Sequence, residues 1–398
     1  MALKAVHVSD VPNLDHVPDN ASALSHFSPR RTSFSTGGGD DRECDSSSRG
    51  SQGYNNNKFP KFLVMGHRGK GMNMLQSPDP RMKSIKENSL LSFNTAAKFP
   101  IDFIEFDVQV TIDDCPVIFH DNFILTEDKG VIIEKRVTDI TLAEFLSYGP
   151  QKENGKVGKF LFRKTKDARI FEWIVENDDP LCTLQEVFEE VESSIGFNIE
   201  LKFDDQIVYK EEELNHVLQV ILQVVNEYAN DRRVIFSSFQ PDAAQLMRKK
   251  QSSYPVFFLT NGGSEVYVDI RRNSLEEAIK LCLAGGLQGI VAEVKSILKN
   301  PGAVNRIKES NLSLLTYGQL NNVPEVVYVQ HLMGVNGVIV DLVQEITEVV
   351  TEYTSPEKED EGDINVFEGT QLPEKKKPQF SQHELSFLLK LISNLIQA

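Results

Sequence analysis

Cysteine is scarce in this sequence, and the few cysteines are far apart. The chain of 398 residues contains Cys44, Cys115, Cys182 and Cys282, and no two of them form a CxxC spacing. A disulfide framework is therefore not expected. We expect reduced thiols, as is usual for a protein inside the cell.

Long apolar runs and a basic excess are also missing. No stretch approaches the roughly 18 consecutive apolar residues of a membrane-spanning helix, and the N-terminus lacks the basic and apolar segments of a secretory signal. We therefore expect no transmembrane segment and no secretion. The formal net charge of −16 disfavours general binding to nucleic acid or anionic lipid. An anionic substrate would need a local cationic pocket or a bound metal ion.

Residues 1–58 are dominated by Ser, Asn, Gly and Asp, which cannot bury enough apolar surface to fold. One interpretation is a disordered tail. The other is a transit segment for an organelle, because the stretch ASALSHFSPRRTSFSTGGG is rich in Ser and Thr, contains two arginines and has no acidic residue. Asp10, Asp15 and Asp19 precede that stretch and argue against a transit segment. The residues leave both interpretations open.

The other end of the chain contains two further segments. Residues 355–380 form a charged linker that contains proline. Residues 381–398 are predicted to form a helix, because Ser381 and Glu384 make a capping box and apolar residues follow at helical spacing. We expect this helix to pack on the main domain. Binding to a partner or to a membrane surface is the alternative.

Between these ends, residues 59–354 alternate short apolar segments with amphipathic helical ones. Continuous Val, Ile, Leu and Phe character is typical of parallel strands covered by helices. Eight such strand–helix units predict an α/β fold, the (β/α)8 TIM barrel, with a doubly wound open sheet as the alternative. The predicted strands begin near residues 62, 102, 197, 233, 255, 288, 312 and 337, and the predicted helices span 88–98, 183–193, 211–229, 241–250, 274–285, 301–310, 323–333 and 344–353.

One apolar segment, residues 116–120, lies too close to the second strand for a helical crossover. It is therefore predicted to return antiparallel through a two-residue turn at Asp113 and Asp114, which places His120 opposite Asp107. The next segment, about 121–180, is too long for an ordinary loop. We expect it to form a small insertion lobe over the barrel mouth.

Polar side chains gather at the predicted C-terminal ends of the first three strands. TIM barrels place their active sites at this end of the strands, so these residues are the candidates for a site. They are His67 and Arg68 after the first strand, Glu105 and Asp107 on the second, His120 on the hairpin, and Glu200 and Lys202 on the third.

The charges of these candidates indicate what they could bind. Three buried carboxylates would repel one another unless a cation lies between them, and oxygen ligands in this number suit Mg²⁺ or Ca²⁺. Arg68 and Lys202 add two positive groups, which suit a phosphate. Taken singly, Glu200 and Lys202 could form a structural ion pair, and His120 could be an ordinary loop histidine. Their joint placement favours a functional site.

The chain contains, in this order, the segments GHRG, KENSLLSF, IEFDVQVTIDDCPVIFHD and NIELK. Together they resemble the glycerophosphodiester phosphodiesterase family, the plant type in particular. The likeness covers roughly residues 60–350. The resemblance implies metal-dependent hydrolysis of deacylated phospholipids, such as glycerophosphocholine or glycerophosphoethanolamine, to sn-glycerol 3-phosphate and an alcohol. Some plant members reside in plastids, so a plastid is favoured over the cytoplasm.

The same resemblance implies a role for each candidate residue. His67 and His120 correspond to the general acid and base, and Arg68 and Lys202 to the phosphate-binding positions. The metal ligands would be Glu105, Asp107 and Glu200. Two segments depart from the family: residues 69–84 are longer than in bacterial members, and TYGQLNN replaces a Trp-containing sequence, where Tyr317 could supply an aromatic wall for choline.

Three other functions fit part of this pattern. A phospholipase C-like or sphingomyelinase D-like enzyme shares the framework but acts at lipid surfaces. The net acidity and the lack of apolar runs in the barrel loops favour a soluble diester instead. A catalytically inactive barrel would not need both histidines. A glycosidase would explain paired carboxylates but not the two histidines with Arg68 and Lys202.

Overall fold

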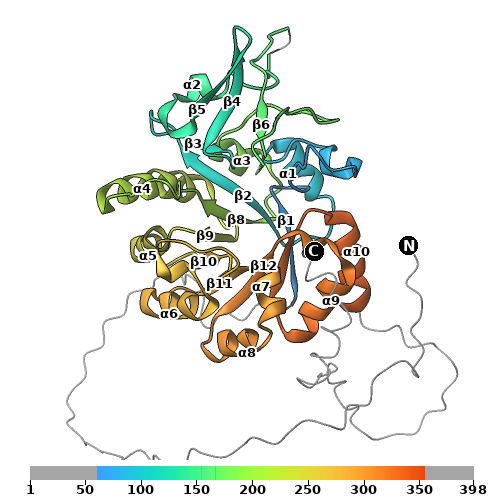
Figure 1. Ribbon diagram of the computed structural model, residues 1–398, viewed down its shortest axis with the longest axis vertical. Coiled ribbons are helices and arrows are strands. Elements are labelled where there is room, and N and C mark those ends of the chain that lie inside the picture. The colour runs from blue at the N-terminus through green and yellow to red at the C-terminus, as the bar shows by residue number, and fades with distance from the viewer. Residues whose placement is uncertain (1–60, 154, 166, 355–398) are drawn as a thin grey trace, which may run out of the picture. The chain divides into compact units, whose positions relative to one another are not determined.

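The computed structural model describes residues 61–153, 155–165 and 167–354 (Figure 1). The segments expected to form the N-terminal tail or transit segment (1–58), the charged linker (355–380) and the last helix (381–398) lie outside these residues. Among the described cysteines, Cys115, Cys182 and Cys282 carry free thiols. In the same part of the chain, no helix is both long and apolar enough to cross a bilayer.

Within the described residues, eight parallel strands close into a barrel (Figure 1). The first strand pairs in parallel with both the last and the second, so the sheet has no free edge at this point. The predicted TIM barrel is confirmed, and the open doubly wound sheet is wrong. The barrel strands are β1 (Leu63–His67), β2 (Phe103–Val110), β8 (Gly196–Leu201), β9 (Val234–Ser238), β10 (Val256–Thr260), β11 (Gly289–Glu293), β12 (Ser313–Tyr317) and β13 (Gly337–Val340).

Helices surround the barrel close to the predicted positions. A short helix, α7 (Val294–Lys299), follows β11 directly and was not predicted. The side chain of Glu293 caps it by accepting a hydrogen bond from the backbone N of Ser296 at 3.2 Å. The predicted helices are α1 (Leu90–Ala96), α3 (Leu184–Glu190), α4 (Glu211–Tyr228), α5 (Pro241–Lys250), α6 (Leu275–Gly285), α8 (Gly302–Glu309), α9 (Pro324–Met333) and α10 (Val343–Thr354). Short 3₁₀ helices are η2 (Pro80–Lys83), η3 (Val137–Asp139), η4 (Ile270–Arg272) and η5 (Gln319–Asn322).

The strand side chains alternate between two apolar cores, as the period of two in a strand requires. Ile104, Phe106 and Val108 of β2 belong to the outer core, which the helices cover. The intervening positions of β2, Glu105 and Asp107, therefore face the barrel interior. The inner core consists of Leu63, Met65, Phe103, Ile235, Phe257, Leu259, Val291, Leu315 and Ile339.

The hairpin after β2 differs from its predicted register by one residue. β3 (Pro116–Ile118) pairs antiparallel with β2, and the backbone N of Phe119 donates to the carbonyl of Asp107 at 3.0 Å. Asp107 therefore lies opposite Phe119, and the predicted pairing with His120 is wrong. The turn contains three residues rather than two, because Thr111 pairs with Cys115 and Asp114 adopts a φ of 60°.

A second, four-stranded sheet follows β3 in the chain, in the order β5-β4-β6-β7 (top of Figure 1). It packs on an apolar cluster of its own, which includes Phe119, Ile124 and Trp173. This sheet occupies much of the segment in which we expected an insertion lobe. Its elements are β4 (Phe123–Asp128), β5 (Val131–Arg136), α2 (Leu142–Phe145), β6 (Phe162–Lys164) and β7 (Ile170–Glu172).

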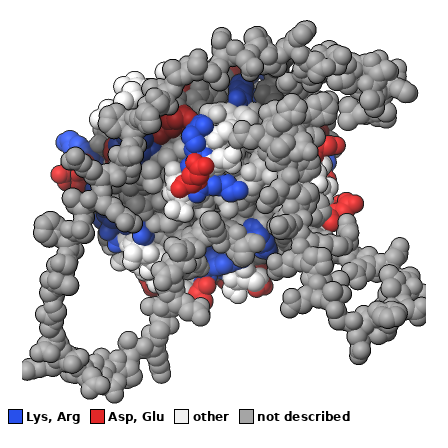
Figure 2. Space-filling view, turned by 90° about the horizontal axis from the view of Figure 1, so that it is seen from below, with Lys and Arg blue, Asp and Glu red and all other residues white. Residues whose placement is uncertain are grey.

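The surface charges are mixed on the face seen from below in Figure 2. The described Lys and Arg side chains lie there among Asp, Glu and uncharged residues. The visible described part of this face has no continuous basic patch of the kind that nucleic acid requires.

Candidate active site

The first strand ends in a tight turn that directs two polar residues to the barrel mouth. A Cβ atom at Gly66 would lie 2.2 Å from the carbonyl oxygen of Gly69, so this turn requires glycine at position 66. Arg68 has a φ of 49°, in the left-handed region. Its backbone N donates to Glu105 Oε2 at 3.0 Å. The GHRG segment thus connects β1 to a carboxylate of β2.

Three carboxylates from two neighbouring strands converge beside this turn. One oxygen from each of Glu105, Asp107 and Glu200 lies within 4.8 Å of the others, and all three residues are buried. Asp107 Oδ2 accepts from Asn88 Nδ2 at 2.8 Å, whereas Asp107 Oδ1 has no hydrogen-bond partner among the described residues. Lys202 Nζ lies 3.5 Å from this oxygen without a hydrogen bond to it, so the oxygen could still bind a metal ion. This donor set fits a hard divalent cation such as Mg²⁺ or Ca²⁺.

The pKa values of the carboxylates reflect their crowding. Burial, and then the charge of Asp107, raise the pKa of Glu105 to about 8. Burial also opposes ionisation of Asp107, but the charges of His120, Lys202 and Arg68 outweigh it and lower the pKa of Asp107. Ionisation of all three carboxylates together is therefore unfavourable unless a cation lies between them.

Two cationic side chains border the carboxylates. Lys202 Nζ donates to Glu200 Oε1 at 2.7 Å and lies 3.5 Å from Asp107 Oδ1. Arg68 Nη1 donates to Glu87 Oε1 at 2.7 Å, and its Nε lies 3.4 Å from Asp107 Oδ2. The ion pair considered for Glu200 and Lys202 is present. It lies inside the candidate site rather than apart from it.

Each of the two candidate histidines bonds a carboxylate through Nδ1. His67 Nδ1 lies 2.7 Å from Asp341 Oδ1, and His120 Nδ1 lies 2.7 Å from Asp121 Oδ1. This contact leaves Nε2 of each ring for other partners, and His67 Nε2 is 3.9 Å from Glu105 Oε2. The one-residue error in the hairpin register did not remove His120 from the site, because His120 lines the same cavity as Glu105 and Glu200.

The candidates converge on one cavity of about 980 Å³ at the barrel mouth. Asp107 is buried beneath this cavity, in contact with Arg68 and Lys202. Tyr317 lines the opposite wall, and its ring packs edge to face on Phe239 with centroids 6.0 Å apart. The six other candidates in the wall are His67, Arg68, Glu105, His120, Glu200 and Lys202.

Single apolar side chains are exposed on two loops beside this cavity, although the barrel loops contain no apolar run. Val208 follows β8 and is 96% exposed, and Val266 and Val268 follow β10 and are 90% and 104% exposed. Arg272 joins the two loops by donating to Asp205 Oδ1 at 2.6 Å. Both acidic and apolar groups therefore border the mouth.

Sequence reasoning missed the residues that hold the candidates in place. Asp341 accepts from the backbone N of Met72 at 2.9 Å and from Asn322 Nδ2 at 2.9 Å, in addition to its contact with His67. Asn322 belongs to the TYGQLNN segment that departs from the family pattern. Asp121 directly follows His120, and this adjacency was the one available signal for its role.

The sequence matches the glycerophosphoryl diester phosphodiesterase family over residues 67–345. This range contains all seven candidate residues and accounts for most of the barrel. The chain belongs to this family. It is therefore a phosphodiesterase, which excludes the glycosidase alternative.

Full-length relatives in Arabidopsis thaliana support the membership. The chain is 58% identical over 398 residues to a chloroplastic glycerophosphodiester phosphodiesterase, with 100% of both chains covered. A second Arabidopsis glycerophosphodiester phosphodiesterase is 62% identical over 343 residues, covering 85% of this chain and 92% of the relative. The chloroplastic name of the first agrees with the plastid expected here.

Solved structures of the family share the barrel. A glycerophosphodiester phosphodiesterase from Parabacteroides distasonis has a TM-score of 0.52 at 20% identity, covering 74% of this chain and 99% of the other. An Oleispira antarctica phosphodiesterase, solved in complex with its product sn-glycerol-3-phosphate, has a TM-score of 0.51 at 19% identity, covering 72% and 96%. At these identities the similarity supports the fold.

Proposed function

We propose that this phosphodiesterase hydrolyses glycerophosphodiesters, such as glycerophosphocholine or glycerophosphoethanolamine, to sn-glycerol 3-phosphate and an alcohol. The observation that supports this most is the cluster of Glu105, Asp107 and Glu200, flanked by a carboxylate-bonded histidine on each side. A Schizosaccharomyces pombe glycerophosphocholine phosphodiesterase is 32% identical over 329 residues, covering 73% of this chain and 28% of that protein. Its name supports a choline headgroup as one substrate.

The three carboxylates would hold a divalent cation, Mg²⁺ or Ca²⁺. Such a cation would supply Lewis-acid stabilisation of a phosphoryl oxygen. The unsatisfied Oδ1 of Asp107 and the mutual repulsion of the carboxylates are the features that fit this group.

The protein side chains would move the protons and bind the phosphate. One of His67 and His120 would take a proton from the attacking oxygen through Nε2, and the other would protonate the leaving alkoxide. Asp341 and Asp121 fix the orientation of the two rings through Nδ1. Arg68 and Lys202 would neutralise the remaining negative charge of the diester. The aromatic wall at Tyr317 and Phe239 would accommodate a quaternary ammonium group.

The test is an assay of the purified protein on glycerophosphocholine that follows glycerol 3-phosphate. Activity is expected to disappear in a chelator and to return with Mg²⁺ or Ca²⁺. Glu105→Gln should abolish the recovery of activity on addition of Mg²⁺ or Ca²⁺. Glu265→Gln should retain this recovery, because Glu265 lines the same cavity but is not one of the three clustered carboxylates. Full activity in thoroughly demetallated protein would contradict the metal assignment.

A second candidate activity is hydrolysis of a diester that keeps one acyl chain. The exposed Val208, Val266 and Val268 beside the cavity favour it, because an acyl chain leaving the mouth would contact them. Val266→Asp combined with Val268→Asp should then decrease activity on lysophosphatidylcholine and leave activity on glycerophosphocholine unchanged. If the variant hydrolysed lysophosphatidylcholine as fast as the parent does, with glycerophosphocholine hydrolysis also unchanged, this second activity would be excluded.

A further inference from the structure

Arg163 connects the second sheet to the barrel site through two carboxylates. It lies on β6, is buried, and reaches Glu87 and Asp121, which precede it by 76 and 42 residues. Its Nη1 and Nη2 donate to the two oxygens of Glu87 at 2.9 and 2.8 Å. Its Nε and Nη2 donate to the two oxygens of Asp121 at 3.0 and 3.2 Å. One guanidinium thus bridges two carboxylates.

Each of these carboxylates also bonds a residue of the proposed site. Glu87 Oε1 accepts from Arg68 Nη1 at 2.7 Å, and Asp121 Oδ1 bonds His120 Nδ1 at 2.7 Å. We infer that Arg163 is a positioning residue for the phosphodiesterase reaction, which holds Arg68 through Glu87 and His120 through Asp121. This inference rests on the roles proposed above for Arg68 and His120.

The chemistry of the contact requires arginine. A guanidinium offers five donors in a planar fork, which can pair with two carboxylates at once, whereas a lysine ammonium is a single point of charge. The same charge supports ionisation of both partners. Burial opposes it, but Arg163 and then Arg68 lower the pKa of Glu87 to about 2, and Arg163 lowers the pKa of Asp121.

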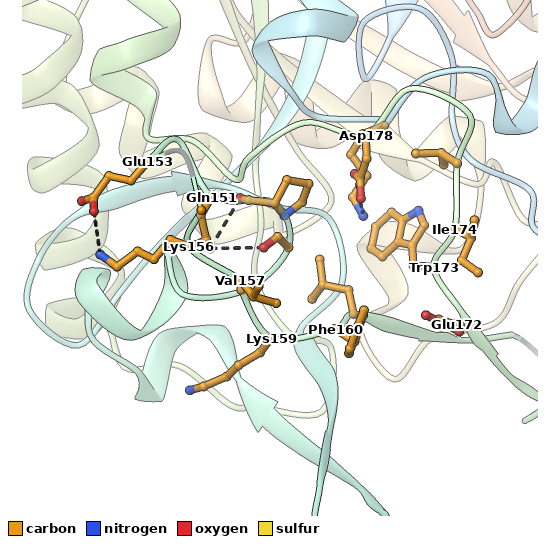
Figure 3. Close-up of a pocket in the computed structure, with 17 residues that line it drawn as sticks. Gln151, Glu153, Lys156, Val157, Lys159, Phe160, Glu172, Trp173, Ile174 and Asp178 are labelled. Carbon is orange, nitrogen blue, oxygen red and sulfur yellow. Dashed lines mark hydrogen bonds and ion pairs between the residues drawn. The ribbon is translucent and has the colours of Figure 1, made fainter.

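Arg163 is itself held on the side of the second sheet. Its guanidinium carbon lies 4.2 Å from the ring centroid of Trp173, and Trp173 Nε1 donates to Asn73 Oδ1 at 3.0 Å. Lys86 Nζ lies 3.9 Å from the centroid of the same ring. Trp173 forms part of the wall of a separate pocket of about 480 Å³ (Figure 3). The packing of the second sheet therefore fixes Arg163 before any substrate arrives.

The test compares Arg163→Ala with Arg169→Ala in the full chain. Arg169 lies between β6 and β7, is 63% exposed and pairs with Asp167 at 2.6 Å, so it matches Arg163 in type and sheet but not in contact with the site. Arg163→Ala is expected to decrease kcat/KM about 100-fold, because a displacement of about 1 Å at reacting groups costs that much. The loss should divide between a lower kcat through His120 and a higher KM through Arg68.

Added guanidinium should restore part of the activity of Arg163→Ala and have no effect on the parent or on Arg169→Ala. Combining Arg163→Ala with Asp121→Asn should cost much less than the product of the two single losses, because both act through His120. Parent-like kcat and KM in a folded Arg163→Ala would overturn the inference. So would a loss that guanidinium leaves unchanged, or two losses that multiply.

If Arg163→Ala does not fold, Arg163→Lys provides the same comparison. Its charge remains but cannot bridge Glu87 and Asp121, so at least a tenfold decrease in kcat/KM is expected with a parent-like circular dichroism spectrum. Parent-like kinetics of this variant would overturn the inference. The proposed function is tested separately, by the rate of the parent on glycerophosphocholine. The variant-to-control ratio is measured on whichever phosphodiester the parent hydrolyses.

Discussion

His67 and His120 are held by different parts of the molecule, although each bonds a carboxylate through Nδ1 at 2.7 Å. His67 ends β1, and Asp341 follows β13, the strand that pairs with β1. His120 follows the antiparallel β3, and its partner Asp121 is held by Arg163 of the second sheet. The barrel alone therefore organises one histidine, whereas the other depends on the added sheet.

The charges around the two rings also differ. Burial lowers the pKa of both histidines. At His67 the charge and hydrogen bond of Asp341, together with the charge of Glu105, outweigh burial, and the pKa is raised. At His120 the charges of Arg68 and Lys202 add to burial, and the pKa is lowered despite the contact with Asp121. The sum of the neighbouring charges decides the direction of the shift, and the bonded carboxylate is only one of those charges.

The largest expected effect comes from removing either ring. His67→Ala and His120→Ala should each decrease kcat by about 10²–10⁴-fold, since each removes a proton-transfer group. His216→Ala, on the surface and paired with Asp114, is the matched control and should retain activity. Steady-state kinetics on glycerophosphocholine measure all three. Near-normal kcat in His67→Ala or His120→Ala would show that the substituted histidine does not transfer a proton in the reaction.

The next effect comes from the carboxylate partners. Asp341→Asn and Asp121→Asn should each decrease kcat about 10- to 100-fold, because partners that orient a functional side chain typically contribute this much. Asp114→Asn, which disrupts the surface pair with His216, is the control. If Asp121→Asn did not change kcat and Asp341→Asn decreased it, the second sheet would not be needed to orient His120. Only the barrel partner of His67 would then matter for catalysis.

The carboxylates between the two histidines should make cation binding depend on pH. Glu105 has a pKa raised to about 8, so below that pH a binding cation must displace its proton. The apparent affinity for Mg²⁺ or Ca²⁺ should therefore fall about tenfold for each pH unit below 8 and level off above it. Isothermal titration calorimetry in buffers of different ionisation enthalpy measures the proton released. Affinity independent of pH between 6 and 8 would place the cation elsewhere.

The smallest effect is expected from the N-terminal segment. A chain that begins at Phe59 keeps the barrel strands and the second sheet, and its kcat/KM should stay within tenfold of the full chain, a difference below about 1.4 kcal/mol. Thermal unfolding of the two chains checks that the barrel is intact. A larger loss of kcat/KM in a folded chain would show that residues 1–58 contribute to substrate binding or catalysis.

The sequence predicted the strands well and the contacts between distant residues poorly. The eight barrel strands are continuous apolar segments, so they can be recognised in the sequence without knowledge of the fold. The turn at Ile112–Asp114 was misjudged because Asp114 adopts a left-handed conformation that two consecutive aspartates do not reveal. The short α7 was missed because six residues show too little helical periodicity.

The candidate site could be predicted only where its residues share a strand or a known motif. Glu105 and Asp107 are two residues apart and must face the same side, which the pattern shows directly. Asp341 and Arg163 could not be found this way. Their partners are 274 and 76 residues away in the chain, and only the closed barrel and the packed second sheet bring them together.

The pairing of β1 with β13 also joins the first barrel strand to be synthesised to the last one. All seven candidate residues have been synthesised once the ribosome passes Lys202, but Asp341 is added much later. Until β13 is made, β1 lacks one of its two neighbours and His67 lacks its partner. Contacts between such distant segments slow folding, because a long stretch of chain must be closed before they form. A chain that ends before β13 therefore lacks the carboxylate that bonds His67.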